Sequence, residues 1–323
     1  MPTGLALGVH DDRSGATAGR SLPAGAASGD GLDWDRDGRD WPNRAASRFV
    51  RAASMDWHLQ EMGDGPALLL LHGTGASTHS WRGLAPLLAT RFHLIAPDLP
   101  GHGFTRATSR EFLSLRGMGW ALRSLLREMP APAVVLGHSA GAAIAVRMTL
   151  DGHIAPRLIV GVNAALLPLR GFPGQIFSPL ARVLARMPVV PRLLARRFDR
   201  EAILSMLERT GSRIDEEGVS LYARLAGSPA HVAAAFGMMA EWDLPSLAAD
   251  LPGLRTRLVL IVGSKDGSIS PADADRVRAI VPGTEIVRLE GLGHLAHEER
   301  PDLVADLVFA AAEDVGVLRR RGA

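Results

Sequence analysis

Short apolar runs alternate along this chain with longer segments in which apolar residues recur at helical spacing. The runs predict buried strands at Ala67–Leu71, His93–Ala96, Ala133–Leu136, Arg157–Val162, Leu258–Val262 and Glu285–Leu289. The segments between them predict helices at Trp81–Ala89, Leu115–Met129, Ala142–Leu150, Ala272–Ile280 and Arg300–Val315. We also expect an antiparallel edge pair, Arg48–Val50 with Trp57–Glu61. This alternation predicts an α/β fold with a mostly parallel central sheet and helices on both faces.

The pattern changes to helices alone between Asn163 and about Asp250. We expect residues 164–250 to form a helical cap over the C-terminal ends of the strands, with residues 34–163 and 251–323 as the α/β core. Residues 1–33 are rich in Gly, Ala, Ser and Asp and have no apolar period. They are predicted to be disordered, and they lack an apolar core long enough for a signal peptide.

One strand runs into a candidate nucleophile. The apolar run Ala133–Leu136 ends in Gly137-His138-Ser139-Ala140-Gly141, a G-x-S-x-G pattern between a strand and a helix. A nucleophile elbow requires this context, because its tight turn lifts the serine hydroxyl clear of the sheet. An ordinary glycine-rich turn is the alternative for Ser139, and the residues at three other strand ends argue against it.

Those strand ends carry the partners that an activated serine needs. Asp266 follows the strand Leu258–Val262, and His294 follows Glu285–Leu289. The order Ser, Asp, His predicts that His294 accepts the Ser139 proton while Asp266 orients the imidazole. The amides of Thr74, after Ala67–Leu71, and of Ala140 are the predicted oxyanion donors.

Each assignment has a competitor nearby. Asp273 and Asp275 follow Asp266, but they come after Pro271 and are typical of a solvated first helical turn. His297 lies three residues after His294, and we assign it to the start of the last helix. His102, in a glycine-rich loop, is expected to stabilise that turn or line the pocket rather than act as a base.

A substrate pocket is expected beside the candidate site. Its predicted lining is His72, Gly73, Trp81, His138, Met238, Met239 and Trp242. Trp120 is a further candidate for this lining. For each tryptophan and methionine, packing in the core is the alternative.

The predicted cap contains an arginine-rich segment, Ile176–Phe198, whose arginines are Arg182, Arg186, Arg192, Arg196 and Arg197. Its simpler interpretation is a lid with an apolar inner face and solvated arginines. The alternative is that the arginines meet an anionic, amphiphilic partner, either a carboxylate-bearing molecule or the headgroups of a membrane.

The motifs HGTG, DLPGHG, GHSAG, GSKD and GLGH together resemble the α/β-hydrolase superfamily over about residues 49–317. The stretches DWPNR, WHLQ and HGTGASTHSW are further similar to the magnesium-chelatase accessory proteins of bacteriochlorophyll biosynthesis in photosynthetic bacteria. The first resemblance implies an α/β-hydrolase fold with a serine triad. The second implies a role in that pathway, with a hydrophobic substrate of the porphyrin type and chelatase subunits as partners.

Composition narrows the function classes. The 323 residues contain no cysteine, which excludes disulfides and cysteine catalysis, and the net charge is only +2. We expect neither a nucleic-acid partner, nor a cofactor, nor a metal site, nor a transmembrane helix. We therefore expect a cytoplasmic protein, and the arginine-rich segment raises the alternative of a peripheral contact with the photosynthetic membrane. Two functions remain: a hydrolase of an ester or related acyl bond, and a non-catalytic module that binds a porphyrin or assists the chelatase.

Overall fold

The computed structural model describes residues 30–107, 109–168 and 189–320. Its centre is a sheet of eight strands in the order β1-β2-β4-β3-β5-β6-β7-β8. Strands β1 and β2 pair antiparallel, as do β2 and β4, and all the other neighbours pair parallel. The predicted α/β fold with a mostly parallel sheet is therefore confirmed. The bounds are β1 Ser47–Ala52, β2 Met55–Met62, β3 Ala67–Leu71, β4 His93–Pro97, β5 Val134–His138, β6 Leu158–Val162, β7 Arg257–Gly263 and β8 Glu285–Leu289.

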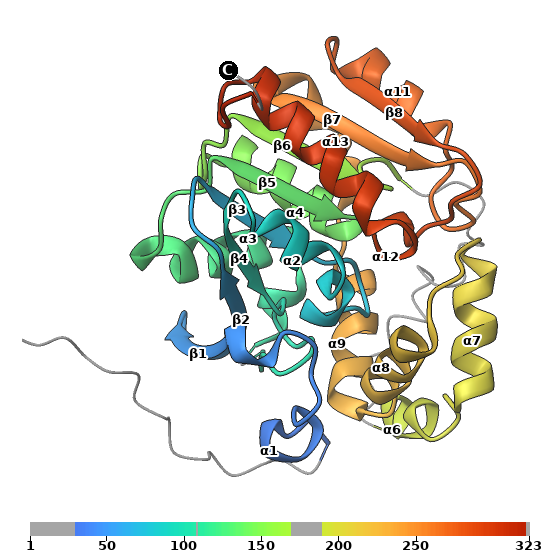
Figure 1. The fold of residues 1–323 in the computed structure, drawn as a ribbon. Coiled ribbons are helices and arrows are strands. Elements are labelled where there is room, and N and C mark those ends of the chain that lie inside the picture. The colour runs from blue at the N-terminus through green and yellow to red at the C-terminus, as the bar shows by residue number, and fades with distance from the viewer. Residues whose placement is uncertain (1–29, 108, 169–188, 321–323) are drawn as a thin grey trace, which may run out of the picture.

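Helices cover both faces of the sheet (Figure 1). Helices α3 (Leu115–Leu125), α4 (Ala140–Leu150) and α11 (Asp273–Ile280) contribute to the core cluster on one face. Helices α2 (Leu84–Leu88) and α13 (Pro301–Asp314) contribute to the cluster on the other. All five residues of β3, β5 and β6 are buried. A strand covered on both faces has no solvated side, which explains why these segments are continuous apolar runs rather than alternating ones.

Two predicted helices are shorter than expected. The predicted helix at 81–89 is a 3₁₀ turn, Thr78–Trp81, followed by α2, and Gly83 stands between them. The predicted helix at 115–129 ends at Leu125 and continues as a 3₁₀ turn, Leu126–Glu128.

The prediction that His297 starts the last helix is wrong. This residue belongs to a separate short helix, α12 (Ala296–Glu299), and α13 begins at Pro301. Arg300 between them has φ −139° and ψ 69°. A residue that precedes proline avoids the helical region because the proline ring crowds its backbone.

Among the described residues between β6 and β7 there are five α-helices: α6 (Val189–Ala195), α7 (Arg200–Arg209), α8 (Glu216–Ala226), α9 (Pro229–Ala240) and α10 (Leu244–Asp250). Figure 1 shows α6, α7, α8 and α9 gathered as a group beside the sheet. We refer to these four helices and their connections as the cap. Although it was predicted as part of the cap, α10 packs Leu244 and Leu247 into the core cluster of α3 and α4.

The N-terminal boundary also differs from the prediction. Residues 1–29 lie outside the described part, but Asp30–Asp33, predicted to be disordered with them, make defined contacts. The Asp30 carbonyl accepts the Ala230 N–H at 2.9 Å, and Leu32 is buried with Trp41 and Phe104. These residues run into the short helix α1 (Trp34–Asp37). Burial of Leu32 in this aromatic cluster offsets the cost of ordering the segment.

Candidate active site

Ser139 lies at the tight turn between β5 and α4. Its φ of 50° and ψ of −113° fall in a region that L-residues rarely adopt, and its N–H donates to the Val162 carbonyl at 2.9 Å. A Cβ at Gly141 would lie 1.9 Å from the Leu71 carbonyl oxygen, so only glycine allows α4 to start this close to β3. Strained backbone of this kind persists where the surrounding structure holds it, and it is frequent at functional sites.

Asp266 and His294 come together in the loops after β7 and β8. The distance from His294 Nδ1 to Asp266 Oδ2 is 2.8 Å. The other carboxylate oxygen, Oδ1, accepts the main-chain N–H groups of Ser268 at 2.7 Å and Ile269 at 2.9 Å. Because the carboxylate is an acceptor in all three contacts, the imidazole proton resides on Nδ1 and Nε2 is left free to accept one.

The main chain of His294 is held by residues of two parallel strands. The Asn163 amide, at the end of β6, donates to the carbonyl oxygens of His294 at 2.7 Å and Gly293 at 2.9 Å. His138, at the end of β5, contacts the same His294 oxygen through Nε2 at 3.0 Å. The pKa of His138 lies well below its ordinary value because burial penalises the charged ring and His297 and His294 lie beside it. His138 is therefore a neutral donor at this position.

Sequence reasoning missed Asn163. Its signal was an amide at the end of an otherwise apolar strand. It adopts φ 47°, which asparagine tolerates better than most residues, and its Oδ1 accepts the Gly263 N–H at 2.8 Å.

A cavity of about 400 Å³ lies between the sheet and the cap. Seven of the predicted site residues line it: Thr74, His138, Ser139, Ala140, Met239, Trp242 and His294. The remaining walls come mainly from α7, α8 and α9, including Ile203, Leu207, Tyr222, Val232, Ala235 and Phe236. Between Ser139 and His294 the described residues show no hydrogen bond, although both face this one cavity.

Four predicted pocket residues, His72, Gly73, Trp81 and Met238, are not among the residues that line the cavity. Trp81 is fully buried in the core cluster around α2 and α13. Met238 is also fully buried, and its Sδ accepts the Thr74 hydroxyl at 3.4 Å. His72 holds its own loop, since its Nε2 accepts the Leu99 N–H at 2.9 Å and its Nδ1 contacts the carbonyl oxygen of Gly73 at 2.8 Å. Trp120, considered with them, is half exposed on α3 and stacks on Phe112.

The part of the cavity lining that the structure describes is mainly apolar. Among the described residues that line it there is no Asp, Glu, Lys or Arg. Burial lowers the pKa of its His231 to about 4, so that this ring is neutral near pH 7. His231 Nδ1 accepts the Gly103 N–H at 3.1 Å, so its Nε2–H donates to the Gly75 carbonyl at 3.0 Å. A neutral, apolar ligand group fits this lining, because an anion would be desolvated there without a cationic partner.

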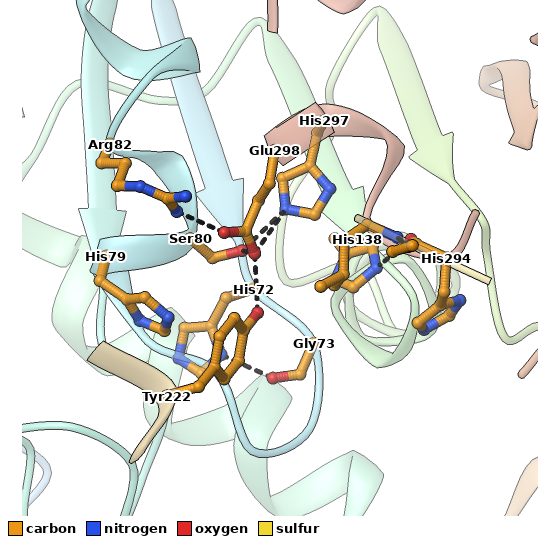
Figure 2. A network of polar contacts seen from close by, with 12 residues as sticks. His72, Gly73, His79, Ser80, Arg82, His138, Tyr222, His294, His297 and Glu298 are labelled. Carbon is orange, nitrogen blue, oxygen red and sulfur yellow. Dashed lines mark hydrogen bonds and ion pairs between the residues drawn. The ribbon is translucent and has the colours of Figure 1, made fainter. Parts of the chain in front are cut away.

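A buried polar network lies behind the cavity wall (Figure 2). The Glu298 carboxylate has no exposed surface and accepts the hydroxyls of Tyr222 at 2.7 Å and Ser80 at 2.8 Å. Arg82 pairs with the same carboxylate and also with Asp215, the N-cap of α8, at 2.6 Å. Burial raises the pKa of Glu298, against the opposing effect of the Arg82 charge. The network ties cap helix α8 to α12, the short helix that follows the loop of His294.

The network ends on His297, which is not among the residues that line the cavity. Because the Ser80 hydroxyl donates to Glu298, its oxygen accepts from His297 Nε2, which lies 2.7 Å away. The His297 ring packs 4.4 Å from that of His138. Burial lowers its pKa to about 3.

The other competitors are also accounted for by structural contacts. His102 is fully buried, and its Nδ1 contacts the Pro100 carbonyl at 3.1 Å. Asp275 is paired with Arg278 and Arg288 at the surface. Asp273, predicted to be solvated, is instead buried, where it pairs with Arg276 at 2.7 Å.

A second acidic side chain supports the loops around the site. Asp98 and His58 are both fully buried and lie 2.7 Å apart. The Asp98 carboxylate also accepts the N–H groups of Thr78 at 2.7 Å and Phe104 at 2.9 Å. Burial raises the pKa of Asp98, but the His58 charge and hydrogen bond outweigh it, and the pKa lies well below its ordinary value.

The fold and this site define a class of protein, and comparison with known proteins agrees. The model of the alpha/beta hydrolase family matches residues 68–307. The chain belongs to the α/β-hydrolase family. Within it, 275 residues are 40% identical to the magnesium-chelatase 30 kDa subunit of Rhodobacter capsulatus, over 84% of this chain and 95% of that protein.

Other relatives include enzymes. The pimeloyl-[acyl-carrier protein] methyl ester esterase of Vibrio vulnificus is 28% identical over 72% of this chain and 88% of its own. Among solved structures, an α/β-hydrolase-fold protein from Burkholderia ambifaria superposes with a TM-score of 0.70 at 22% identity, covering 82% of this chain and 97% of that chain. A lipase-like protein from Acinetobacter baumannii gives the same TM-score at 21% identity, over 83% and 91% of the two chains. These structural matches establish the fold alone.

The described residues contain neither a membrane-spanning helix nor a metal-binding cluster. No helix in them is long and apolar enough to cross a bilayer. Nor do the described His, Asp and Glu side chains form a cluster that could hold a metal ion.

Proposed function

We propose that this protein is a serine hydrolase that cleaves an ester, or a related acyl bond, of a hydrophobic substrate. The observation that carries the proposal is the Asp266–His294 pair, whose 2.8 Å contact leaves Nε2 free beside the cavity that Ser139 also faces. The elbow conformation of Ser139 supports it, because an exposed hydroxyl at a strained turn is what nucleophilic attack requires.

In the proposed reaction, Ser139 Oγ attacks the acyl carbon while His294 Nε2 takes the hydroxyl proton. The N–H groups of Thr74 and Ala140 donate to the oxyanion that forms. The C–O bond to the alcohol then breaks, and His294 returns the proton to the leaving oxygen. Water, deprotonated by His294, hydrolyses the acyl-enzyme and regenerates Ser139, while Asp266 stabilises the imidazolium in both halves.

The mainly apolar lining of the cavity narrows the proposed substrate. An apolar acyl or alcohol group of the ester enters it, and any free carboxylate of the same molecule stays outside. The similarity to a magnesium-chelatase subunit supports a tetrapyrrole intermediate of bacteriochlorophyll synthesis as that molecule. The similarity to a methyl ester esterase supports the reaction type.

A fluorophosphonate probe tests the proposal, because it reacts with activated serines. We expect the purified protein to be labelled, and the Ser139→Ala and His294→Ala variants to remain unlabelled while keeping the wild-type circular dichroism spectrum. Asp273→Ala is the matched control, since Asp273 contacts Arg276 rather than the imidazole. Absence of labelling in the wild type would refute an activated Ser139.

A second candidate function is non-catalytic: the fold binds a porphyrin or assists chelatase subunits. It is supported by the name of the 40% identical relative. The two candidates differ in one genetic test. If the protein is an enzyme, Ser139→Ala fails to restore pigment synthesis in a deletion strain. If it is a binding module, the same stably folded variant restores it.

We also propose a peripheral membrane contact through the cap. Leu193 of α6 is 54% exposed, and Arg196 and Arg197 beside it are exposed. Arg192 pairs with Asp30, whereas Arg182 and Arg186 lie outside the described residues. Flotation with anionic liposomes tests this contact: we expect binding by the wild type and its loss in Arg196→Glu/Arg197→Glu. No flotation of the wild type would refute it.

A further inference from the structure

The turn between α7 and α8, Thr210–Ser212, belongs to the cap but contacts both loops of the candidate pair. The carbonyl oxygen of Thr210 accepts the N–H of His294 itself at 3.1 Å. The same oxygen accepts the N–H of Gly267, the residue after Asp266, at 3.0 Å. One carbonyl of the cap thus bridges the two loops.

Two more contacts extend this bridge. The Ser212 hydroxyl, on a side chain that is almost fully buried, accepts the Leu295 N–H at 2.7 Å. Glu299 accepts the Arg213 N–H at 3.2 Å and the Gly293 N–H at 2.9 Å. Leu295, which follows His294, is therefore held by the turn itself, whereas Gly293, which precedes His294, shares the Glu299 carboxylate with Arg213, the residue after the turn.

The turn lies so close to the loops of Asp266 and His294 that no side chain fits between their backbones. A Cβ at Gly211, which has φ +82°, would lie 1.9 Å from the Lys265 carbonyl oxygen. A Cβ at Gly293 would lie 2.3 Å from the Gly211 carbonyl carbon. All of these neighbours are backbone atoms, which cannot rotate away. The turn and the loops therefore interlock in a way that any larger residue would disturb.

We infer that the turn Thr210–Ser212 is a positioning element of the candidate site: it holds the Asp266 and His294 loops at the spacing at which their side chains are hydrogen-bonded. The inference rests on the proposed function for its effect on reactivity. It does not make the turn catalytic, because the contacts are to main-chain groups of the loops. It does mean that α7 and α8 cannot swing away from the core without loosening the Asp266–His294 contact.

The test compares two glycine substitutions with similar backbone strain. Gly211→Ala places a Cβ on a backbone with positive φ and also against the Lys265 carbonyl oxygen. Gly283→Ala places a Cβ on a backbone with a similar φ, +90°, but with no atom within contact distance. Two readouts are used: the rate of fluorophosphonate labelling of Ser139, and the NMR resonance of the His294 Nδ1 proton. That proton is visible when its bond to Asp266 shields it from exchange, and its resonance is assigned by its absence in His294→Gln.

We expect Gly211→Ala to lose the Nδ1 resonance and to be labelled at least about tenfold more slowly, since small displacements of reacting groups cost rate steeply. Gly283→Ala should keep the Nδ1 resonance and the wild-type labelling rate, although its melting temperature should fall. Retention of the resonance and of rapid labelling in folded Gly211→Ala would overturn the inference. If the wild type shows the resonance but never reacts with the probe, the proposed hydrolase function fails, and the resonance still decides the role of the turn.

Should Gly211→Ala not fold, Ser212→Ala decides the question. It removes only the hydroxyl that accepts the Leu295 N–H. Ser114→Ala is its control, because that hydroxyl accepts the Gly117 N–H at the start of α3, away from the site. Slower labelling and a weakened Nδ1 resonance in Ser212→Ala alone support the inference, and equal behaviour of the two variants overturns it.

Discussion

His138 Nε2 lies 3.0 Å from the main-chain oxygen of His294, so the residue before the candidate nucleophile holds the residue that carries the candidate base. Asn163 donates to the same oxygen from the neighbouring strand. Two neighbouring parallel strands, β5 and β6, thereby converge on the loop after β8. The relative placement of Ser139 and His294 is fixed by main-chain contacts rather than by a direct bond between their side chains.

Replacing His138 tests this arrangement. We expect His138→Leu to slow fluorophosphonate labelling by about tenfold, because the His294 loop loses one of its two side-chain donors. The free energy of unfolding should fall by only about 1 kcal/mol, since the Asn163 donor remains. His138→Gln, which keeps an N–H donor, should recover part of the rate. Labelling of His138→Leu at the wild-type rate would contradict the role assigned to this contact.

Breaking the buried Asp98–His58 pair should destabilise the fold. Asp98→Asn removes the charge that faces His58, and neither side chain has any exposed surface. We expect a loss of about 3–5 kcal/mol in the free energy of unfolding, the usual cost of leaving one buried partner uncompensated. Chemical denaturation measures it. The exposed pair Arg257–Glu285 provides the control, because Glu285→Gln should cost less than about 1 kcal/mol.

Acid should destabilise the protein through its buried histidines. In the folded state the pKa values of His231 and His297 are about 4 and about 3, against 6.5 for an unperturbed histidine. As the pH falls below about 6.5, the unfolded chain binds protons that the folded chain does not, so stability decreases. Each residue contributes about 1.4 kcal/mol per pH unit in the range from about pH 6 to about pH 4.

Urea unfolding at several pH values checks this expectation. His297→Gln keeps a donor for Ser80 and cannot titrate, so its stability should depend on pH less steeply than that of the wild type, by about 1.4 kcal/mol per pH unit. Parallel curves for the two proteins would show that His297 is not kept neutral by the fold.

Filling the cavity should change which acyl chain is accepted. Ala235 of α9 lines the cavity, and Ala235→Trp would occupy much of its 400 Å³. With a series of p-nitrophenyl esters, we expect hydrolysis of long acyl chains to fall by about tenfold or more while the acetyl ester is unaffected. The acetyl ester is the internal control. A uniform loss over the series would indicate damage to Ser139 or His294 instead.

Periodicity was sufficient to predict the sheet, because fully buried parallel strands read as uninterrupted apolar runs. Ala67–Leu71 and Glu285–Leu289 were predicted to the residue. Helix ends were harder: the break at Arg300 depends on Pro301, and the split near Gly83 depends on local backbone geometry. Asp30–Asp33 were misjudged because their order comes from contacts with residues far along the chain.

Motif spacing brought Asp266 and His294 together correctly, since strand ends in a parallel sheet meet at one edge. Motif spacing could not distinguish apolar residues that line the cavity from apolar residues that pack in the core. Met238 and Met239 are neighbours on α9, yet only Met239 lines the cavity, because their side chains leave the helix about 100° apart. Asn163 and the turn at Thr210 were beyond reach for a different reason. Their roles arise from hydrogen bonds to main-chain groups, which leave no residue pattern at the partner position.

The interlock of Gly211 with Gly293 also bears on how such a chain can be re-engineered and how it could have diversified. A cap that shares no backbone hydrogen bonds with the catalytic-site loops can be exchanged for another without disturbing them. Here the junction at Thr210–Ser212 shares backbone hydrogen bonds with the loops of Asp266 and His294. A graft that imports a foreign cap must therefore import this junction as well, because a crossover between α7 and α8 would separate the turn from the loops that it holds.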